Sequence, residues 1–241
     1  MSGFVAGAVI GYVAVGTVAA VAVGAAVGYV VGGAVMDMLT PDMPDVGAGT
    51  QGAMTNKASS NDPIPIIYGE RRIGATQVFV ETSGSDNIYL YEILILGEGE
   101  IDSVTEIIVD DESLVGSKFE NYVTYTIHSG LDDQAADSNL MSASSGWTSN
   151  HRLRGTAYAY VRLEYDQDTF TGGIPTINFV TKGVKVYDPR TSTTAWSDNP
   201  ALCIRDYLTN TRYGRGLDAS EIDDTSFSSA ANYCDELVDL T

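Results

Sequence analysis

NIYLYEILIL, residues 87–96, and TAYAYVRLEY, residues 156–165, are the two stretches that decide the fold. The first is dense in Ile, Leu and Tyr, and the second has one of the clearest strand compositions in the chain. Aromatic and β-branched side chains fit a pleated, buried surface, and runs of this length are typical of strands. Both stretches are therefore predicted to be strands of a β-rich body.

Shorter strands are predicted on both sides of this pair. The full set of predicted strands is 64–68, 73–81, 87–96, 101–109, 124–127, 156–165, 177–180 and 184–187. Prolines at the start of the first limit it to an edge or a first strand, and Lys182-Gly183 between the last two is typical of a tight turn. Many short strands separated by Gly and Asn predict a mainly β fold with some α-helix, a sandwich or a partly closed barrel.

Helical patterns follow the strands. Asn199 is a good N-cap with Pro200 at the first helical position, and Gly214 and Gly216 are predicted to end this helix. Its buried stripe is predicted to be Leu202, Cys203, Tyr207 and Leu208. A second helix is predicted from near Thr225, with the stripe Phe227, Ala230, Ala231, Cys234, Leu237 and Val238. The polar residues 128–155 have little periodicity and are predicted to form a long surface loop or insertion.

Charge is distributed unevenly along the 241 residues. The formal net charge is −19, from 13 Lys and Arg against 32 Asp and Glu, which argues against tight binding of nucleic acid. Residues 1–36 contain no charged side chain and consist mostly of Val, Ala and Gly. Four segments follow from this composition: an apolar helix at 1–36, a flexible linker at 37–62, a β-rich domain at 63–198, and a helical segment at 199–241 that leads into a further domain.

The apolar leader, residues 1–36, carries glycine at every fourth position in two places. These glycines are Gly3, Gly7, Gly11, Gly24, Gly28 and Gly32. On a helix they form two stripes where another helix approaches closely, and the apolar run is long enough to cross a bilayer. The sequence leaves three interpretations open: a cleaved signal peptide, a membrane anchor, and a helix packed against its own copies inside an assembly.

The rest of the chain offers little chemistry. Two histidines and two cysteines exclude a His-based metal site and a disulfide scaffold, so the protein is predicted not to be an enzyme and to need no cofactor or metal. Acidic groups at 110–112 and at Asp166 and Asp168 do not have the spacing of a calcium loop. Cys203 and Cys234 are predicted to be free, buried thiols. Arg205, Arg212 and Arg215 are candidate partners for the acids beyond Leu217.

Three stretches together resemble the tail-tip attachment (host-specificity) protein J family of long-tailed phages, also called central tail hub proteins. They are PIPIIYGERRIGATQVFVETSGSDNIYLYEILILGEGEIDSVTEIIVDD at 63–111, GIPTINFVTKGVKVYDPR at 173–190, and NPALCIRDYLTNTRYGRGLDASEID at 199–223. The match covers most of 63–223 in the family's order.

The resemblance implies a structural protein, a homotrimer that closes the distal end of the tail tube in the virion. It implies the distal tail protein, the tape measure protein and other tail-tip proteins as neighbours, and assembly in the host cytoplasm. The acidic charge favours DNA passing through the lumen without specific binding. The apolar leader is predicted to plug the lumen or to contact the host membrane during entry. Two alternatives stay open: a membrane-anchored bacterial β-domain adhesin or secretion component, and a cell-wall-degrading enzyme.

Overall fold

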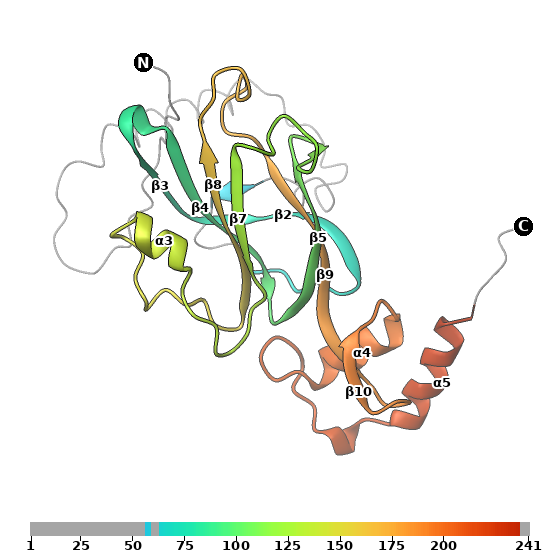
Figure 1. Ribbon diagram of the computed structural model, residues 1–241. Coiled ribbons are helices and arrows are strands. Elements are labelled where there is room, and N and C mark those ends of the chain that lie inside the picture. The colour runs from blue at the N-terminus through green and yellow to red at the C-terminus, as the bar shows by residue number, and fades with distance from the viewer. Residues whose placement is uncertain (1–55, 59–62, 237–241) are drawn as a thin grey trace, which may run out of the picture.

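The computed structural model describes residues 56–58 and 63–236. These residues form two sheets that pack face to face, followed by a small helical unit (Figure 1). The first sheet has the strand order β1-β3-β4-β8-β7. Its strands are β1 (Lys57–Ala58), β3 (Thr76–Ser83), β4 (Tyr89–Glu98), β8 (Thr156–Glu164) and β7 (Val123–His128).

The second sheet is built around β9 (Ile177–Asp188), a strand of 12 residues. β5 (Ile101–Val109) pairs with one edge of β9, and β2 (Glu70–Gly74) and β10 (Thr193–Trp196) pair with the other. The two-residue β6 (Glu112–Ser113) extends the sheet beyond β5. All pairs in this second sheet are antiparallel. The described body is mainly β with some α-helix, as the sequence predicts, and its two sheets do not close into a barrel.

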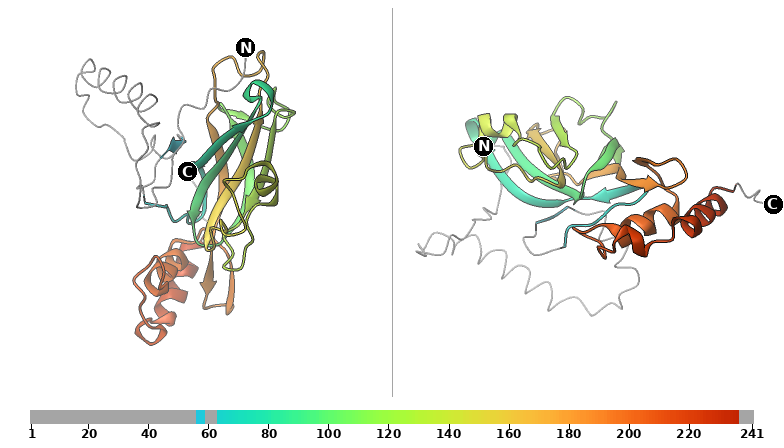
Figure 2. Two further views of the ribbon diagram at one scale, coloured as in Figure 1. Left: turned by 90° about the vertical axis from the view of Figure 1, so that its left-hand side faces the viewer. Right: turned by 90° about the horizontal axis from the view of Figure 1, so that it is seen from below.

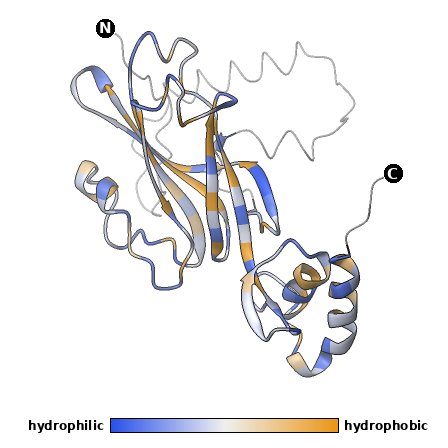
Figure 3. Ribbon diagram, turned by 45° about the vertical axis from the view of Figure 1, so that its right-hand side comes forward, coloured by the Kyte–Doolittle hydropathy of each residue, from blue (hydrophilic) through white to orange (hydrophobic). Residues whose placement is uncertain are grey.

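The two sheets lie face to face (Figure 2). The main core lies between them, where alternate side chains of each strand meet. Leu90 and Leu94 of β4 and Phe179 of β9 are almost completely buried there. Hydrophobic residues concentrate on the strands, as the colouring in Figure 3 shows. Since side chains alternate between the faces of a strand, this core uses only half of β4.

The other face of β4 is covered by the polar segment 128–155. Within it, α3 (Ser138–Ala143) and its flanks place Ala136, Leu140 and Trp147 against Tyr158, Tyr160 and other residues of the outer face. The segment, expected at the surface, is therefore buried in part. The second cover explains why residues 87–96 are nearly all apolar, because both faces of β4 are buried.

A buried carboxylate holds this covering segment in place. Asp137 is 1% exposed and caps α3, accepting a hydrogen bond from the Leu140 backbone N–H at 2.8 Å. Its other oxygen lies 2.9 Å from His128 Nε2, and the His128 ring stacks on Tyr158 with 4.3 Å between the centroids. The contact between Asp137 and His128 therefore ties the beginning of α3 to the first sheet.

The C-terminal unit packs on the second half of β9. It contains α4 (Pro200–Thr209), a 3₁₀ turn at Ala219–Glu221, and α5 (Asp224–Cys234). Its small core consists of Val184, Val186, Ala201, Leu202 and Ala231, with Ile66, Tyr68 and Phe227 packed against it. The Asn199 side chain accepts hydrogen bonds from the Ala201 and Leu202 N–H groups, which confirms the predicted cap.

Details of these helices differ from the prediction. α4 ends at Thr209, because the chain turns at Asn210 before it reaches the glycines. Of the predicted stripe, Leu202 is buried but Tyr207 is 43% exposed, and Arg205 takes the buried position instead. Cys203 is half-buried and Cys234 is exposed, so the cysteines are free, but the prediction of buried thiols is wrong. The small core has room only for the α5 face that contains Ala231.

Four predicted strands differ in the structure. Residues 73–81 are split at Ala75, because the chain passes there from β2 in the second sheet to β3 in the first. Residues 64–68 are extended but belong to neither sheet. The turn predicted at Lys182-Gly183 is wrong, since β9 continues through both residues.

Gly183 is required for a close approach between two backbones. Its N–H donates to Gly69 O at 2.8 Å, and the next residue's N–H donates to Ile67 O at 2.9 Å. A Cβ atom at Gly183 would lie 1.9 Å from Ile67 O. Glycine in a strand interior therefore marks this approach and not a turn.

Candidate functional site

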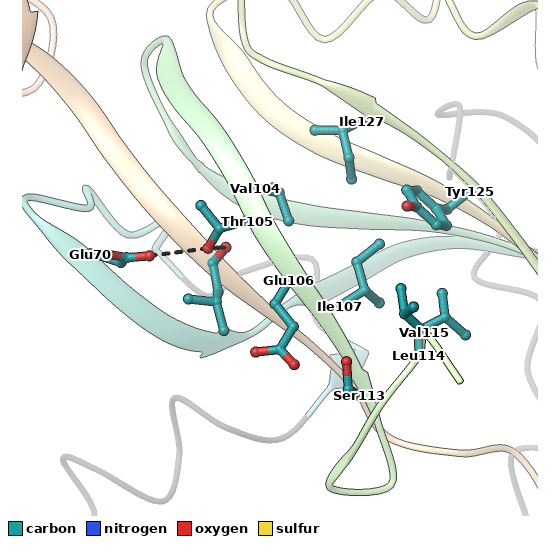
Figure 4. Close-up of a pocket in the computed structure, with 11 residues that line it drawn as sticks. Glu70, Val104, Thr105, Glu106, Ile107, Ser113, Leu114, Val115, Tyr125 and Ile127 are labelled. Carbon is teal, nitrogen blue, oxygen red and sulfur yellow. Dashed lines mark hydrogen bonds between the residues drawn. The ribbon is translucent and has the colours of Figure 1, made fainter. Parts of the chain in front are cut away.

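An open groove lies between β5 and β7 of the sandwich (Figure 4). Its volume is about 520 Å³, within the range of protein ligand sites. It is lined by Glu70, Val104, Thr105, Glu106, Ile107, Ser113, Leu114, Val115, Tyr125, Ile127 and Val180. Sequence reasoning did not find this groove, because its two sides come from different sheets.

The groove exists because β5 and β7 meet at only one end. The Ile101 N–H donates to Ser129 O at 2.9 Å, just beyond the end of β7. Gly130 follows with φ of 95°, and a Cβ atom there would lie 2.4 Å from Gly99 O. The two strands are thus in backbone contact at this corner, and the groove opens between them further along.

A β-bulge shapes the β5 side of the groove. The register against β9 shifts between Val104 and Glu106, which leaves Thr105 as the extra residue. The Thr105 hydroxyl donates to Glu70 Oε1 at 3.1 Å or to Val180 O at 3.3 Å. Since bulges bend a strand and interrupt its pairing, this one turns the β5 edge and sets two carboxylates beside the groove.

Glu92 is a buried carboxyl group on the inner face of β4. It is 3% exposed, and the Gln77 amide donates a hydrogen bond to it at 2.5 Å. Burial raises the pKa of Glu92 from 4.5 to about 7, although the Gln77 bond acts in the opposite direction. Glu92, with one amide partner, therefore takes up a proton more readily in this core than an exposed glutamate does.

A polar cluster joins the extended segment 64–68 to the C-terminal helices. The Tyr68 hydroxyl donates to Asp206 Oδ2 at 2.7 Å, and the Tyr213 hydroxyl donates to the same oxygen at 3.0 Å. Burial raises the pKa of both phenols, and the neighbouring Asp206 carboxylate raises them further. Both phenols therefore act as neutral donors that fix the position of α4.

The predicted arginine pairings are correct in one case. Arg205 is buried, donates to both Asp224 oxygens at 2.7 and 3.2 Å, and lies over the Tyr187 ring. Arg212 instead pairs with Glu98, at the end of β4, and Arg215 forms no ion pair with the residues that the structure describes. The acids Asp218 and Asp223 cap the helical turns that follow them, which lowers the pKa of each.

Three of the acidic residues singled out in the sequence have structural partners. Asp110 accepts from the Thr176 N–H at 2.8 Å, Asp111 pairs with Arg72, and Asp166 accepts from Thr169. Within residues 56–58 and 63–236, no three His, Cys, Asp or Glu side chains are arranged to hold a metal ion. In the same part of the chain, no helix has the length and hydropathy needed to cross a membrane.

The glycine stripes of the leader lie outside the described residues, as do the linker up to residue 55, Leu237 and Val238. Their arrangement stays a prediction. The open groove lies elsewhere, on the β-rich body.

No family model matches the chain, and no curated protein matches it. Among solved structures, the chain is similar to one from the virion of a native gene transfer agent particle, with a TM-score of 0.45 and 19% sequence identity. The match covers 71% of this chain and 40% of that one, so this chain spans less than half of its length. A likeness of this size carries no argument about function.

Proposed function

We propose that the chain is a structural tail-tip hub protein of a long-tailed phage or phage-like particle. In this proposal it is a virion component at the distal end of the tail, assembled as a homotrimer in the host cytoplasm. It contacts the distal tail protein and the tape measure protein, and it has no catalytic activity.

The resemblance of residues 63–111, 173–190 and 199–223 to the hub family carries the proposal. The structure supports it by bringing these three stretches into contact. The first contains β2 and β5, which pair with β9 from the second, and α4 from the third packs against β9. The resemblance therefore refers to one folded unit, in which matches far apart in the sequence share a core.

The charge of the chain supports a role as a conduit for DNA. A net charge of −19 repels the phosphate backbone, so DNA passes without being held. An adhesin on a bacterial membrane has no need of this property.

Labelling of intact particles tests the proposed location. Antibodies against the full-length chain are applied to purified particles from cells that produce it, and the copy number is measured by quantitative mass spectrometry. We expect label at the distal tail end, with the copy number of a single trimer. Absence from particles, with recovery in the bacterial membrane fraction, would support the adhesin alternative instead. Hydrolysis of purified peptidoglycan by the chain would contradict the non-enzymatic role.

In this proposal the chain also takes part in host attachment, and the leader plugs the lumen or contacts the host membrane and helps DNA pass into the cell. A substitution in the leader tests this part of the proposal. Gly28→Leu places a bulky side chain on a glycine stripe, whereas Val27→Leu changes a neighbouring apolar residue and is the matched control. We expect Gly28→Leu particles to adsorb normally and to deliver their genome with much lower efficiency. Adsorption and genome delivery are measured separately on the same particles. Normal delivery by the Gly28→Leu particles would show that the leader is only a tether.

A further inference from the structure

We propose that the groove between β5 and β7 binds an extended segment of a partner protein, in which apolar residues alternate and lysine or arginine lies at the ends. The segment adds as a strand to the open edges of β5 and β7. This inference does not rest on the proposed function, because it uses only the geometry and charge of the groove.

β7 offers a free edge along the groove. It is the last strand of the first sheet, and its other edge pairs with β8. The Glu164 N–H of β8 donates to Tyr122 O at 2.8 Å, so these two residues form a hydrogen-bonded pair. Along an antiparallel ladder, pairs with and without hydrogen bonds alternate. By this alternation the backbone N–H and C=O groups of Tyr125 and Ile127 point away from β8, toward the groove.

β5 offers a second free edge on the opposite side. It pairs with β9 on one edge, but on the other only Ile108 and Val109 pair with β6. In the described part of the chain, no backbone hydrogen bond reaches this edge between residues 102 and 106. Unpaired edges are templates for a further strand, and proteins recognise extended peptides in this way.

Apolar side chains line the space between these edges. Tyr125 is 46% exposed and Val115 is 78% exposed, and Figure 4 shows both facing the same opening as Ile107 and Ile127. Exposed apolar side chains that gather at one place mark interaction surfaces. An added strand with apolar residues at alternate positions covers them, because its side chains alternate between the two faces.

Charge decides between the possible occupants. The lining of the groove contains the carboxylates Glu70 and Glu106 and no Lys, Arg or His. A second copy of this chain, with a net charge of −19, is repelled by this rim. The chain's own residues 1–36 carry no charge that could pair with it. A segment of another protein with alternating apolar residues and basic ends covers the apolar side chains of the groove and pairs with Glu70 and Glu106.

Binding of synthetic peptides to the full-length chain tests this proposal. The probe is a fluorescent decapeptide of alternating valine and threonine with two lysines at each end, followed by fluorescence anisotropy. We expect it to bind, and to bind more weakly as salt is raised. The same peptide with glutamates at its ends is expected to bind at least about fivefold more weakly. A lysine-ended peptide with N-methylated backbone amides is expected not to bind, because it cannot join a ladder.

Variants of exposed residues locate the binding site without disturbing the core. Glu106→Lys reverses one of the two charges beside the groove and is expected to weaken binding of the lysine-ended peptide about fivefold. Val115→Ser removes an apolar contact without changing the charge of the rim and is expected to weaken the binding of both peptide types. Asp133→Lys makes the same charge change at an exposed position outside the groove and is expected to have no effect. Circular dichroism checks that each variant is folded.

Four results would overturn the proposal. The first is no binding of the lysine-ended peptide, and the second is equal binding of the glutamate-ended peptide. The third is binding that appears only after residues 1–36 are removed, which would assign the groove to the chain's own leader. The fourth is self-association of the full-length chain that Val115→Ser abolishes, which would assign the groove to a second copy.

Discussion

Gly183→Ala is expected to lower the free energy of unfolding by about 3 kcal/mol, a large part of the total stability of a domain. The added Cβ would lie 1.9 Å from Ile67 O and 2.4 Å from Ile67 C, both of them backbone atoms. Relief of this clash must separate β9 from the extended segment before β2. Urea unfolding of the full-length chain, followed by circular dichroism, measures the loss.

Gly172→Ala is the matched control for this substitution. Gly172 is exposed, and a Cβ atom there meets no atom within 4 Å. Alanine at such a position reduces the freedom of the unfolded chain, so we expect no loss of stability or a small gain. Equal stability of the two variants would contradict the close approach of residue 67 to β9.

Glu92→Gln is expected to remove a pH dependence of folding. The folded-state pKa of Glu92 is raised from 4.5 to about 7, mainly by burial. Between these values the folded chain holds a proton that the unfolded chain has released, so stability falls as the pH rises through this window. The shift corresponds to a loss of about 3 kcal/mol between pH 4 and pH 8. Glutamine keeps a neutral partner for Gln77 and does not titrate.

The measurement is urea unfolding of both proteins at pH 4, 6 and 8. The advantage of Glu92→Gln over the unmodified chain should grow by about 3 kcal/mol from the lowest pH to the highest. Glu112→Gln removes one charge at an exposed position of β6 and serves as the control. An advantage that stays constant with pH would show that Glu92 is not the titrating group.

Local patterns predicted the strands whose neighbours are also local. β5 begins and ends where predicted, at Ile101 and Val109, because a glycine turn precedes it and an acidic turn follows it. β8 ends one residue before the predicted Tyr165. The cap at Asn199 was equally predictable, since it depends on residues only two and three positions away.

Long-range contacts decided the features that sequence reasoning missed. Gly183 has the appearance of a turn residue, and only the approach of Ile67 gives it another role. Arg205 can be buried because its guanidinium donates to the Asp224 carboxylate and lies over the Tyr187 ring, and both partners are on other elements. The groove likewise depends on how β5 and β7 diverge from their contact at Ile101 and Ser129, which no local pattern encodes.

The length of β9 has a mechanical consequence. Its first half pairs with β2 and β5, and its second half supports the small core beneath α4 and α5. Antiparallel hydrogen bonds run perpendicular to their strands, so tension along β9 shears many of them at once instead of peeling them one by one. A force that pulls the C-terminal helices along this axis is therefore transmitted through β9 to the centre of the sandwich, and the hydrogen bonds of β9 to β2 and β5 resist it together.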